Sequence, residues 1–245
     1  SIVVDTHVPE NRETREFRKQ IFKVELEKEG RSNVKIAYNT SIDDFDFVKG
    51  NAVKPDKTQK KETVNAVPKI KPDTALLRAN APFYYPDFSN DIHHEVELVL
   101  RVNKEGKNIQ EKYSSKYYDA IGLGIDFTAR DLQQKAKEKG LPWDIAKGFN
   151  GSAPISDKFI PVADIQDLKN INFSLTVNGE LRQQGNTSLM LFSFDYIISY
   201  LSKFFTLRAG DLIFTGTPKG VGPVKVGDRL SGSIENEKVL EFDVK

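Results

Sequence analysis

Polar and hydrophobic residues alternate most clearly in the run HHEVELVLRV, residues 93–102. Read as a β-strand, this run places Glu95 and Glu97 on one face and every second residue from Val96 to Val102 on the other. The acids could line a solvent-exposed polar face, the usual place for alternating charges. If they are buried, they require a positive partner, because an unpaired buried charge is costly. A divalent metal ion meets that requirement.

A second strand is predicted over AIGLGIDF, residues 120–127, with the large hydrophobic side chains on one face and Gly122, Gly124 and Asp126 on the other. The two glycines would leave space beside Asp126, as a backbone close to a ligand requires. A helix is then expected to begin at Thr128. Thr128 and Asp131 have the spacing of a capping box, and Gly140 is the expected C-terminal cap.

The rest of the chain predicts more strands than helices. Asn178-Gly179 marks a tight hairpin turn, and hydrophobic residues recur at helical spacing over 194–205. Short strands are expected near the end of the chain, at 211–215, 229–234 and 238–244. The fold class expected from this pattern is a β-rich α+β structure.

The first third differs in character. Charges are dense, and short alternating patterns over 22–26 and 34–38 suggest a hairpin. Residues 54–66 have almost no hydrophobic content and read as a linker or long loop. We therefore expect an N-terminal charged, β-containing segment over 1–68 and a catalytic domain over 69–245.

Composition restricts the chemistry. The 245 residues carry a net charge of +1, so no global field favours nucleic acid or an anionic membrane, and no run is hydrophobic enough to span one. Cysteine is absent and there are three histidines, so a metal site must be built mainly from oxygen. Mg²⁺ or Mn²⁺ is expected, with Ca²⁺ as a substitute, rather than zinc. The expected compartment is the cytoplasm, or the mitochondrion in a eukaryote.

Candidate substrate-binding groups follow Asp126. Arg130 and Gln133 are three apart on the first turns of the predicted helix and so face the same way. Arginine offers a fork of donors suited to a carboxylate. Lys147 lies between hydrophobic neighbours, where an isolated cation often pairs with an anion. We expect His93 and His94 to pack or to support the site rather than to bind the metal.

Several runs together resemble the fumarylacetoacetate hydrolase family, closest to its acylpyruvate hydrolase and oxaloacetate decarboxylase branch. They are HHEVELVL, GIDFTARDLQ, KGLPWDIAKGF, VNGELRQQGNTS and GDLIFTGTPKGVGPV, in the family's order over residues 69–245. The resemblance implies a mixed β-roll or β-sandwich fold assembled as a homodimer. It also assigns metal binding to Glu95, Glu97 and Asp126, and substrate contacts to Arg130, Gln133, Lys147 and Thr217.

The implied function is the metal-dependent cleavage of a C–C bond in a small 2-keto acid through a metal-stabilised pyruvate enolate. Lys147 and Gln133 would assist, and the reaction is acylpyruvate hydrolysis, oxaloacetate decarboxylation or both. One alternative is an isomerase or decarboxylase of aromatic-degradation intermediates. Another is a metal-binding member of the family without hydrolase activity.

Hydrolysis needs a base to activate water. In the family that base comes from an N-terminal lid with a G-R-N-Y run, followed by a His and, three residues later, a Glu. The G-R-N-Y run is missing here, and His7-Val8-Pro9-Glu10 alone has the spacing. His7 and Glu10 are therefore the candidates for the catalytic pair of a hydrolase.

Overall fold

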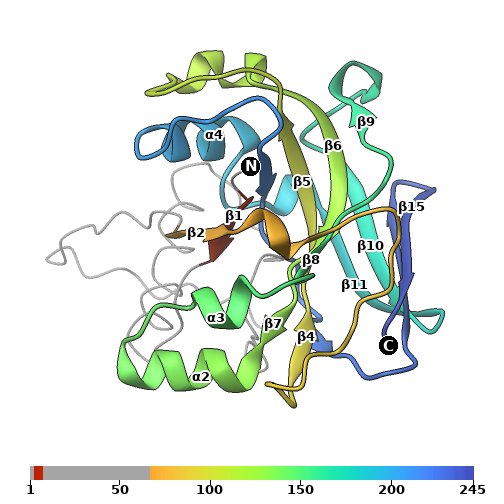
Figure 1. Ribbon diagram of the computed structural model, residues 1–245. Helices are drawn as coiled ribbons and strands as arrows, with labels where there is room; N and C mark the ends of the chain where they lie inside the picture. Colours follow the sequence, from red (N-terminus) through yellow and green to blue (C-terminus); the bar gives the residue numbers. More distant parts are fainter. Residues whose placement is uncertain (1–2, 8–66) are drawn as a thin grey trace, which may run out of the picture.

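The computed structural model describes residues 3–7 and 67–245 (Figure 1). Its largest sheet has six strands in the order β2-β1-β12-β5-β6-β9. All neighbours in this sheet are antiparallel except β1 and β12, which are parallel. The strands are β1 (Val3–His7), β2 (Val67–Lys71), β5 (Val96–Val102), β6 (Tyr118–Ile125), β9 (Ile160–Pro161) and β12 (Leu212–Phe214).

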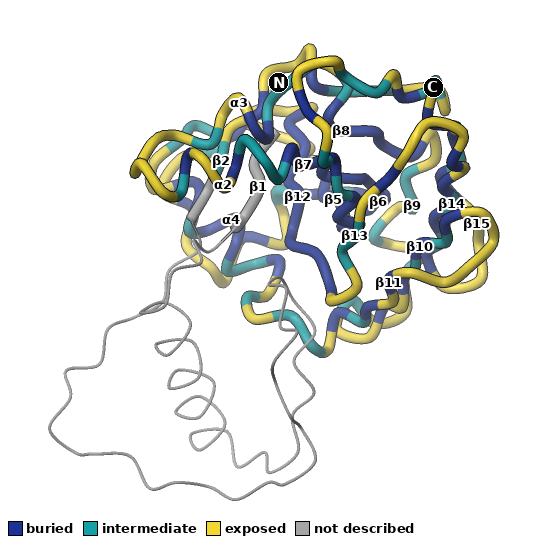
Figure 2. The backbone as a smooth tube through the Cα atoms, turned by 90° about the horizontal axis from the view of Figure 1, so that it is seen from below, coloured by how far each residue is buried: buried dark blue, intermediate teal, exposed yellow. Residues whose placement is uncertain are grey.

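A second, four-stranded antiparallel sheet has the order β11-β10-β14-β15. Its strands are β10 (Asn172–Val177), β11 (Glu180–Asn186), β14 (Arg229–Ile234) and β15 (Glu237–Asp243). The main hydrophobic core joins residues of β5 and β6 to residues of β10, β14 and β15, so it lies between the two sheets. Figure 2 shows β5 and β6 buried along most of their length, whereas the tips of the second sheet are exposed.

Smaller sheets complete the β-structure. One has the order β13-β4-β7, and β3 pairs with β8 in parallel. The strands are β3 (Leu76–Leu77), β4 (Ile92–His94), β7 (Thr128–Ala129), β8 (Ala153–Pro154) and β13 (Gly222–Pro223).

Three α-helices are described: α2 (Arg130–Lys139), α3 (Asp144–Lys147) and α4 (Phe194–Ser202). The 3-10 turns are η1 (Asp73–Ala75), η2 (Glu111–Lys116), η3 (Val162–Asp164) and η4 (Thr187–Leu189). None of the helices in residues 67–245 is long and hydrophobic enough to cross a membrane. The excess of strands over helices confirms the predicted α+β class.

The predicted strand over 93–102 is interrupted, although its alternation is confirmed. Strand β4 ends at His94, β5 begins at Val96, and Glu95 lies between them. The break arises because β4 pairs with β7 and β13, whereas β5 pairs with β6 and β12. Glu95 and Glu97 are fully buried, which excludes the solvent-exposed reading of this face.

The glycines of β6 serve a purpose different from the one predicted. A Cβ at Gly122 would lie 2.7 Å from the ring of Phe159, and one at Gly124 would overlap the ring of Phe214. These residues therefore make room for aromatic side chains from distant parts of the chain, not for a ligand. The large residues on the opposite face of β6 lie in the core as predicted.

The predicted capping box before α2 is wrong. The N-cap is Ala129, and Thr128 instead belongs to β7 and donates its hydroxyl to the Asp126 carbonyl. The carboxylate of Asp131 accepts from Ser89 Oγ at 2.7 Å. Gly140 is the C-cap in the left-handed conformation, as predicted.

The hairpin turn, the later helix and the three strands predicted near the end of the chain are present. Asn178 and Gly179 both have positive φ and connect β10 to β11, which is the geometry of a tight hairpin turn. Helix α4 is shorter than predicted, because it ends at Ser202 and Phe204 beyond it is exposed.

Most of the N-terminal predictions cannot be compared with the structure. The hairpin over 22–26 and 34–38, the linker over 54–66 and Glu10 lie outside the described residues. Strand β1 is described, and it lies in the large sheet between β2 and β12. The boundary between segments 1–68 and 69–245 stays a prediction.

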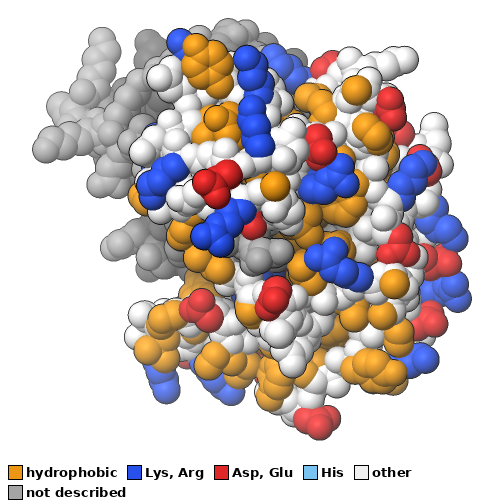
Figure 3. Space-filling model, turned by 45° about the horizontal axis from the view of Figure 1, so that its top comes forward, with side chains coloured by type: hydrophobic (Ala, Val, Ile, Leu, Met, Phe, Trp, Pro, Cys, Tyr) orange, Lys and Arg blue, Asp and Glu red, His pale blue; other side chains and the backbone are white. Residues whose placement is uncertain are grey.

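On the face shown in Figure 3, Lys and Arg side chains lie among Asp and Glu side chains, with hydrophobic side chains between them. No field of a single sign covers this face, which agrees with the net charge of +1.

Candidate metal and substrate site

The site forms where two neighbouring chain segments leave the large sheet together. Glu95 interrupts β4 and β5, and Asp126 follows the end of β6 just before β7. The Asp126 amide donates to the Glu95 carbonyl at 2.8 Å, so the two interruptions lie side by side. A side chain at such a break can turn away from the sheet, and both carboxylates converge there.

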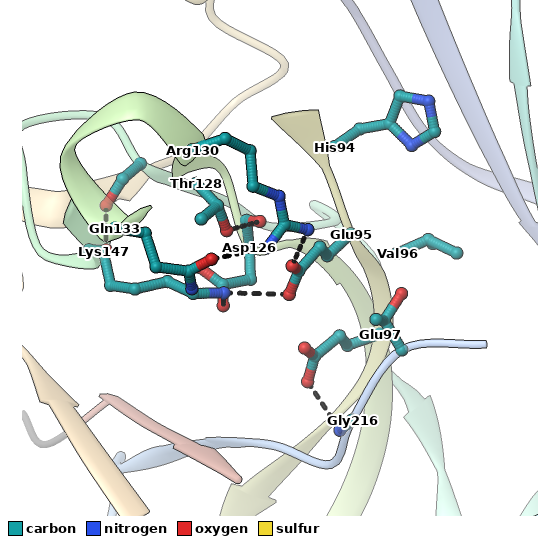
Figure 4. A network of polar contacts seen from close by, with 12 residues as sticks. His94, Glu95, Val96, Glu97, Asp126, Thr128, Arg130, Gln133, Lys147 and Gly216 are labelled. Atoms are coloured by element: carbon teal, nitrogen blue, oxygen red, sulfur yellow. Dashed lines mark hydrogen bonds and ion pairs between the residues drawn. The ribbon is translucent and has the colours of Figure 1, made fainter. Parts of the chain in front are cut away.

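Three carboxylates form the centre of the site. One oxygen from each of Glu95, Glu97 and Asp126 lies within 4.8 Å of the others, and all three residues are fully buried. The Glu97 carboxylate also accepts from the Gly216 amide, through Oε2 at 2.6 Å. Figure 4 shows the three carboxylates facing a common space between the strands and α2.

Three cations contact these acids. Lys147 Nζ lies 2.8 Å from Glu95 Oε2 and also pairs with Asp126. Lys71 Nζ lies 2.6 Å from Asp126 Oδ1, and Arg130 pairs with Glu95. Both lysines are almost completely buried. The three positive groups balance the three negative ones, which is what a low-dielectric site demands.

Lys71 was not among the residues predicted from the sequence. It ends β2, where its backbone pairs with Val3 of β1. Its ammonium donates to the Lys147 carbonyl and to Ser152 Oγ at 3.2 Å, so it holds the end of α3 as well as Asp126. The one available signal was a lysine between Ile70 and Pro72 at the end of a short strand, and other lysines of the chain have comparable neighbours.

Arg130 and Gln133 lie together on the first turn of α2, as predicted. Arg130 Nη1 donates to Gln133 Oε1 at 2.9 Å, which fixes the orientation of the amide. Gln133 Nε2 is buried and has no acceptor within the described part of the chain. Figure 4 shows both side chains reaching from α2 toward Glu95. The pair therefore presents donors beside the acids.

The loop after β12 forms the opposite wall. Its Gly216 binds Glu97, and Thr217 is fully buried. Gln183 of β11 donates to Thr217 Oγ1 and accepts from His94 Nδ1 at 2.9 Å. Burial lowers the pKa of His94, so its imidazole is neutral. Because Gln183 Oε1 can only accept, the ring proton lies on Nδ1. Gln183 was not predicted, although it lies in the run VNGELRQQGNTS.

Neither His93 nor His94 belongs to the acidic cluster found within the described residues, and their supporting role stays a prediction. His93 Nε2 lies 2.8 Å from Asp91 Oδ1, at the rim of the site. Burial lowers the pKa of His93, and the nearby Arg130 guanidinium lowers it further.

His7, one of the two N-terminal candidates, lies on a strand that leads away from the site. The register pairs His7 with Val67, four residues before Lys71, which is about 13 Å along an antiparallel strand. Glu10 lies outside the described residues. The catalytic role predicted for His7 and Glu10 stays a prediction.

Comparison with known proteins identifies the family. Residues 47–245 match the family model described as fumarylacetoacetate (FAA) hydrolase C-terminal. The chain belongs to the fumarylacetoacetate hydrolase family. This match includes every strand from β2 onward and confirms both the resemblance and the predicted fold.

Relatives within the family are enzymes of 2-keto acid chemistry. The mitochondrial oxaloacetate tautomerase of Mus musculus is 47% identical over 176 residues, which are 72% of this chain and 79% of that protein. The mitochondrial oxaloacetate decarboxylase of Dictyostelium discoideum is 41% identical over 191 residues, 75% of this chain and 87% of that protein.

A solved structure is similar as well. It is fumarylpyruvate hydrolase from Pseudomonas aeruginosa in complex with Mn²⁺ and pyruvate. It shares 36% identity and a TM-score of 0.69, and the match covers 73% of this chain and 78% of that chain.

The acidic cluster suits a divalent metal. Its donors are carboxylate oxygens alone, which magnesium and manganese prefer. Three carboxylates within 4.8 Å repel one another strongly unless cations lie between them. Lys71, Lys147 and Arg130 supply such cations, and Glu95, Glu97 and Asp126 are the residues that would hold the metal ion.

Proposed function

We propose that this chain is a divalent-metal-dependent enzyme that acts on oxaloacetate and related small 2-keto acids through their enolates. The observation that carries the proposal is the buried group of three carboxylates paired with Lys71, Lys147 and Arg130. The oxaloacetate tautomerase and decarboxylase among the relatives support the same class of substrate.

Charge balance favours a dicarboxylate. The three acids and three cations cancel, so a bound Mg²⁺ or Mn²⁺ leaves the site with two positive charges. Buried charge is costly unless it is paired, and a dianion such as oxaloacetate restores neutrality. A neutral ketone would leave both charges uncompensated.

The side chains have distinct tasks in this proposal. Arg130 offers its guanidinium fork to a substrate carboxylate, and its bond to Gln133 turns the amide Nε2 toward the same space. Lys147 holds an ammonium group against Glu95 and Asp126, where it stabilises negative charge that develops on the keto oxygen. When bound, the metal supplies Lewis-acid stabilisation of that same charge.

Tautomerisation and decarboxylation each pass through an enolate, that of oxaloacetate in the first and that of pyruvate in the second. Removal of a proton from C3 of oxaloacetate gives its enolate, and return of a proton to oxygen gives the enol. Loss of CO₂ breaks the C3–C4 bond and leaves its electron pair in the pyruvate enolate, which is then protonated at carbon. Neither reaction needs an activated water, so neither requires the N-terminal pair for that task.

The test is a direct assay of oxaloacetate with purified protein. Enol disappearance is followed by ultraviolet absorbance and pyruvate formation by a coupled assay, with Mg²⁺, Mn²⁺, Ca²⁺ or a chelator. We expect activity with Mg²⁺ and Mn²⁺ and none with the chelator. Absence of both reactions with all three metals would contradict the proposal.

A second candidate is acylpyruvate hydrolysis, which the similar fumarylpyruvate hydrolase structure favours. Here pyruvate release from acetylpyruvate is compared between the wild type, His7→Ala and Glu10→Gln. A loss in both variants would assign the base to this pair, and equal rates would remove it from the mechanism. No release by the wild type would exclude hydrolysis, and would leave the isomerase reading or a metal-binding protein without hydrolase activity.

We also propose that the chain assembles as a homodimer, as its family resemblance implies. Light scattering on the purified protein tests this. The compartment of this chain stays a prediction, although the relatives from Mus musculus and Dictyostelium discoideum are mitochondrial.

A further inference from the structure

Gln183 connects parts of the molecule that are distant in sequence. It lies on β11 of the four-stranded sheet, whereas the acids lie where β5 begins and β6 ends in the six-stranded sheet. Its side chain is 1% exposed. The amide reaches the break between β4 and β5 on one side and the loop after β12 on the other.

All four hydrogen-bonding positions of this amide are used. Oε1 accepts from Val96 N and from His94 Nδ1, each at 2.9 Å. Nε2 donates to Thr217 Oγ1 and to the Pro218 carbonyl, each at 2.8 Å. A backbone amide can only donate and a carbonyl can only accept, so Val96 and Pro218 fix which end of the amide is which.

The fixed amide also settles the direction of the bond to Thr217. Because Gln183 donates to it, Thr217 Oγ1 is an acceptor in this bond and keeps its own hydrogen for another partner. Among residues 67–245, the bond from Gln183 is the hydrogen bond that the Thr217 hydroxyl makes. Thr217 follows Gly216, whose amide binds Glu97, so the backbone of this loop lies beside the acidic cluster.

A separate observation shows that the loop is pressed onto β11. Gly220 has a φ of +98°, and a Cβ at this position would overlap the carbonyl oxygen of Arg182. A second contact would be with the Gln183 side chain, at 3.4 Å. At Gly220, three residues after Thr217, the backbone of the loop thus rests on Arg182 and Gln183 of β11.

We propose that Gln183 is a positioning residue that makes the Thr217 hydroxyl a hydrogen-bond donor toward the anionic substrate and thereby sets its affinity. The inference rests on the proposed function, because it requires an anion bound beside the acidic cluster. Gln183 touches no substrate itself and acts through Thr217.

Gln183→Glu is the decisive variant because it preserves the shape while it reverses the bond to Thr217 and removes the bond to the Pro218 carbonyl. The introduced carboxylate still accepts from Val96 and His94, but it has no hydrogen to give Thr217 and accepts the threonine hydrogen instead. We expect KM for oxaloacetate to rise about 10- to 100-fold, as for loss of one hydrogen bond to a charged group, with a smaller change in kcat. Gln183→Met, which leaves the hydroxyl free to rotate, should raise KM less.

Gln184→Glu is the matched control. This residue adjoins Gln183 on β11, but it is exposed on the other face of the strand, so the same chemical change there should leave KM unchanged. Thermal unfolding of all variants separates an effect on folding from an effect on binding. A purely structural role predicts that Gln183→Met and Gln183→Glu lose affinity in proportion to their loss of thermal stability.

A double-mutant cycle with Thr217→Val completes the test. If Gln183 acts through the hydroxyl, Gln183→Glu should raise KM no further once the hydroxyl is absent. Additive effects would overturn the inference. The dissociation constant of oxalate, a small dianion, is measured with Mg²⁺ by calorimetry for the same proteins as a readout that needs no turnover.

The two readouts separate the inference from the proposed function. Oxalate binding without oxaloacetate turnover would overturn the proposed function. The dissociation constants of the four proteins in the double-mutant cycle would still decide the role of Gln183. Turnover with equal constants for Gln183→Glu and Gln184→Glu would overturn the inference alone. A wild type that neither binds oxalate nor acts on oxaloacetate would overturn both.

Discussion

The paired strands β5 and β6 have two ends of opposite character. At one end Leu98 faces Leu123 and Leu100 faces Ile121, and all four side chains are fully buried in the core between the sheets. At the other end the same strands lead into Glu95, Glu97 and Asp126, which are equally buried but charged.

Equal burial therefore has opposite energetic meaning at the two ends. Each hydrophobic side chain in the core contributes about 1.5–3 kcal/mol through removal from water. A buried ion pair repays its desolvation only with good geometry, so the charged end is weak as a source of stability. The hydrophobic end stabilises the two strands. This stability keeps the three carboxylates of the charged end close together although they repel one another.

Glu97→Gln should have the largest effect, and it falls on activity. The amide keeps the shape but removes a charged oxygen ligand. We expect turnover of oxaloacetate with Mg²⁺ to fall by more than about 100-fold, since loss of even an indirect partner of a metal ligand costs 10–100-fold in affinity. Glu105→Gln, an exposed acid on the loop after β5, is the control. Retained activity would show that the metal site lies elsewhere.

Lys147→Met should cause the largest loss of stability. It leaves Glu95 and Asp126 with one cation fewer, and breaking a buried pair costs about 3–5 kcal/mol. For a chain of this size that corresponds to a fall in Tm of about 6–20 °C. Scanning calorimetry with and without Mg²⁺ should show a larger metal-dependent rise than in the wild type. Lys158→Met, which removes an exposed pair with Glu237, should change Tm little.

Leu98→Ala tests the hydrophobic end. The cavity should lower the free energy of unfolding by about 2–5 kcal/mol, measured by urea denaturation. Because no charge changes, Mg²⁺ should raise Tm by the same amount as in the wild type. A variant that lost its response to Mg²⁺ while still folded would mean that the two ends are not independent.

Tyr118→Phe should have the smallest effect, and it depends on pH. Burial raises the pKa of Tyr118 above its ordinary value. The nearby Asp195, which accepts a hydrogen bond from the Tyr118 hydroxyl, raises this pKa further. The tyrosine of the unfolded chain ionises near pH 10. The contribution of Tyr118 to the free energy of unfolding is therefore full below about pH 10 and is lost as pH rises above it. Urea unfolding at pH 7 and 10.5 should show a loss of about 1 kcal/mol at pH 7 and a shallower alkaline decline in the variant. An unchanged alkaline decline would contradict this account.

Features that depend on short-range pattern were predictable from the sequence. Alternation placed Glu95 and Glu97 on one face, and a short apolar run ending in an acid identified Asp126. Arg130 and Gln133 followed from helical spacing. Each of these inferences needs only the geometry of one strand or one helix turn.

Features that depend on distant partners were not predictable. The rings that fill the space over Gly122 and Gly124 come from Phe159 and Phe214, so the glycines could equally have indicated a ligand. Gln183 reaches Val96 across 87 positions, and nothing in the pattern of β11 shows that contact. Thr128 is a residue type that can cap a helix, but here it belongs to β7 and pairs with His93 of β4.

The parallel pairing of β1 with β12 has a consequence for the order of folding. Val3 pairs with Leu212, so a strand near the start of the sequence waits for one made after most of the chain has been synthesised. Contacts between residues so far apart in sequence form late, because closing the long loop between them loses chain entropy before the contact is made. Until β12 is made, the edge of β1 that will pair with it is open to any other extended segment. Aggregation during synthesis is therefore the hazard that this topology carries.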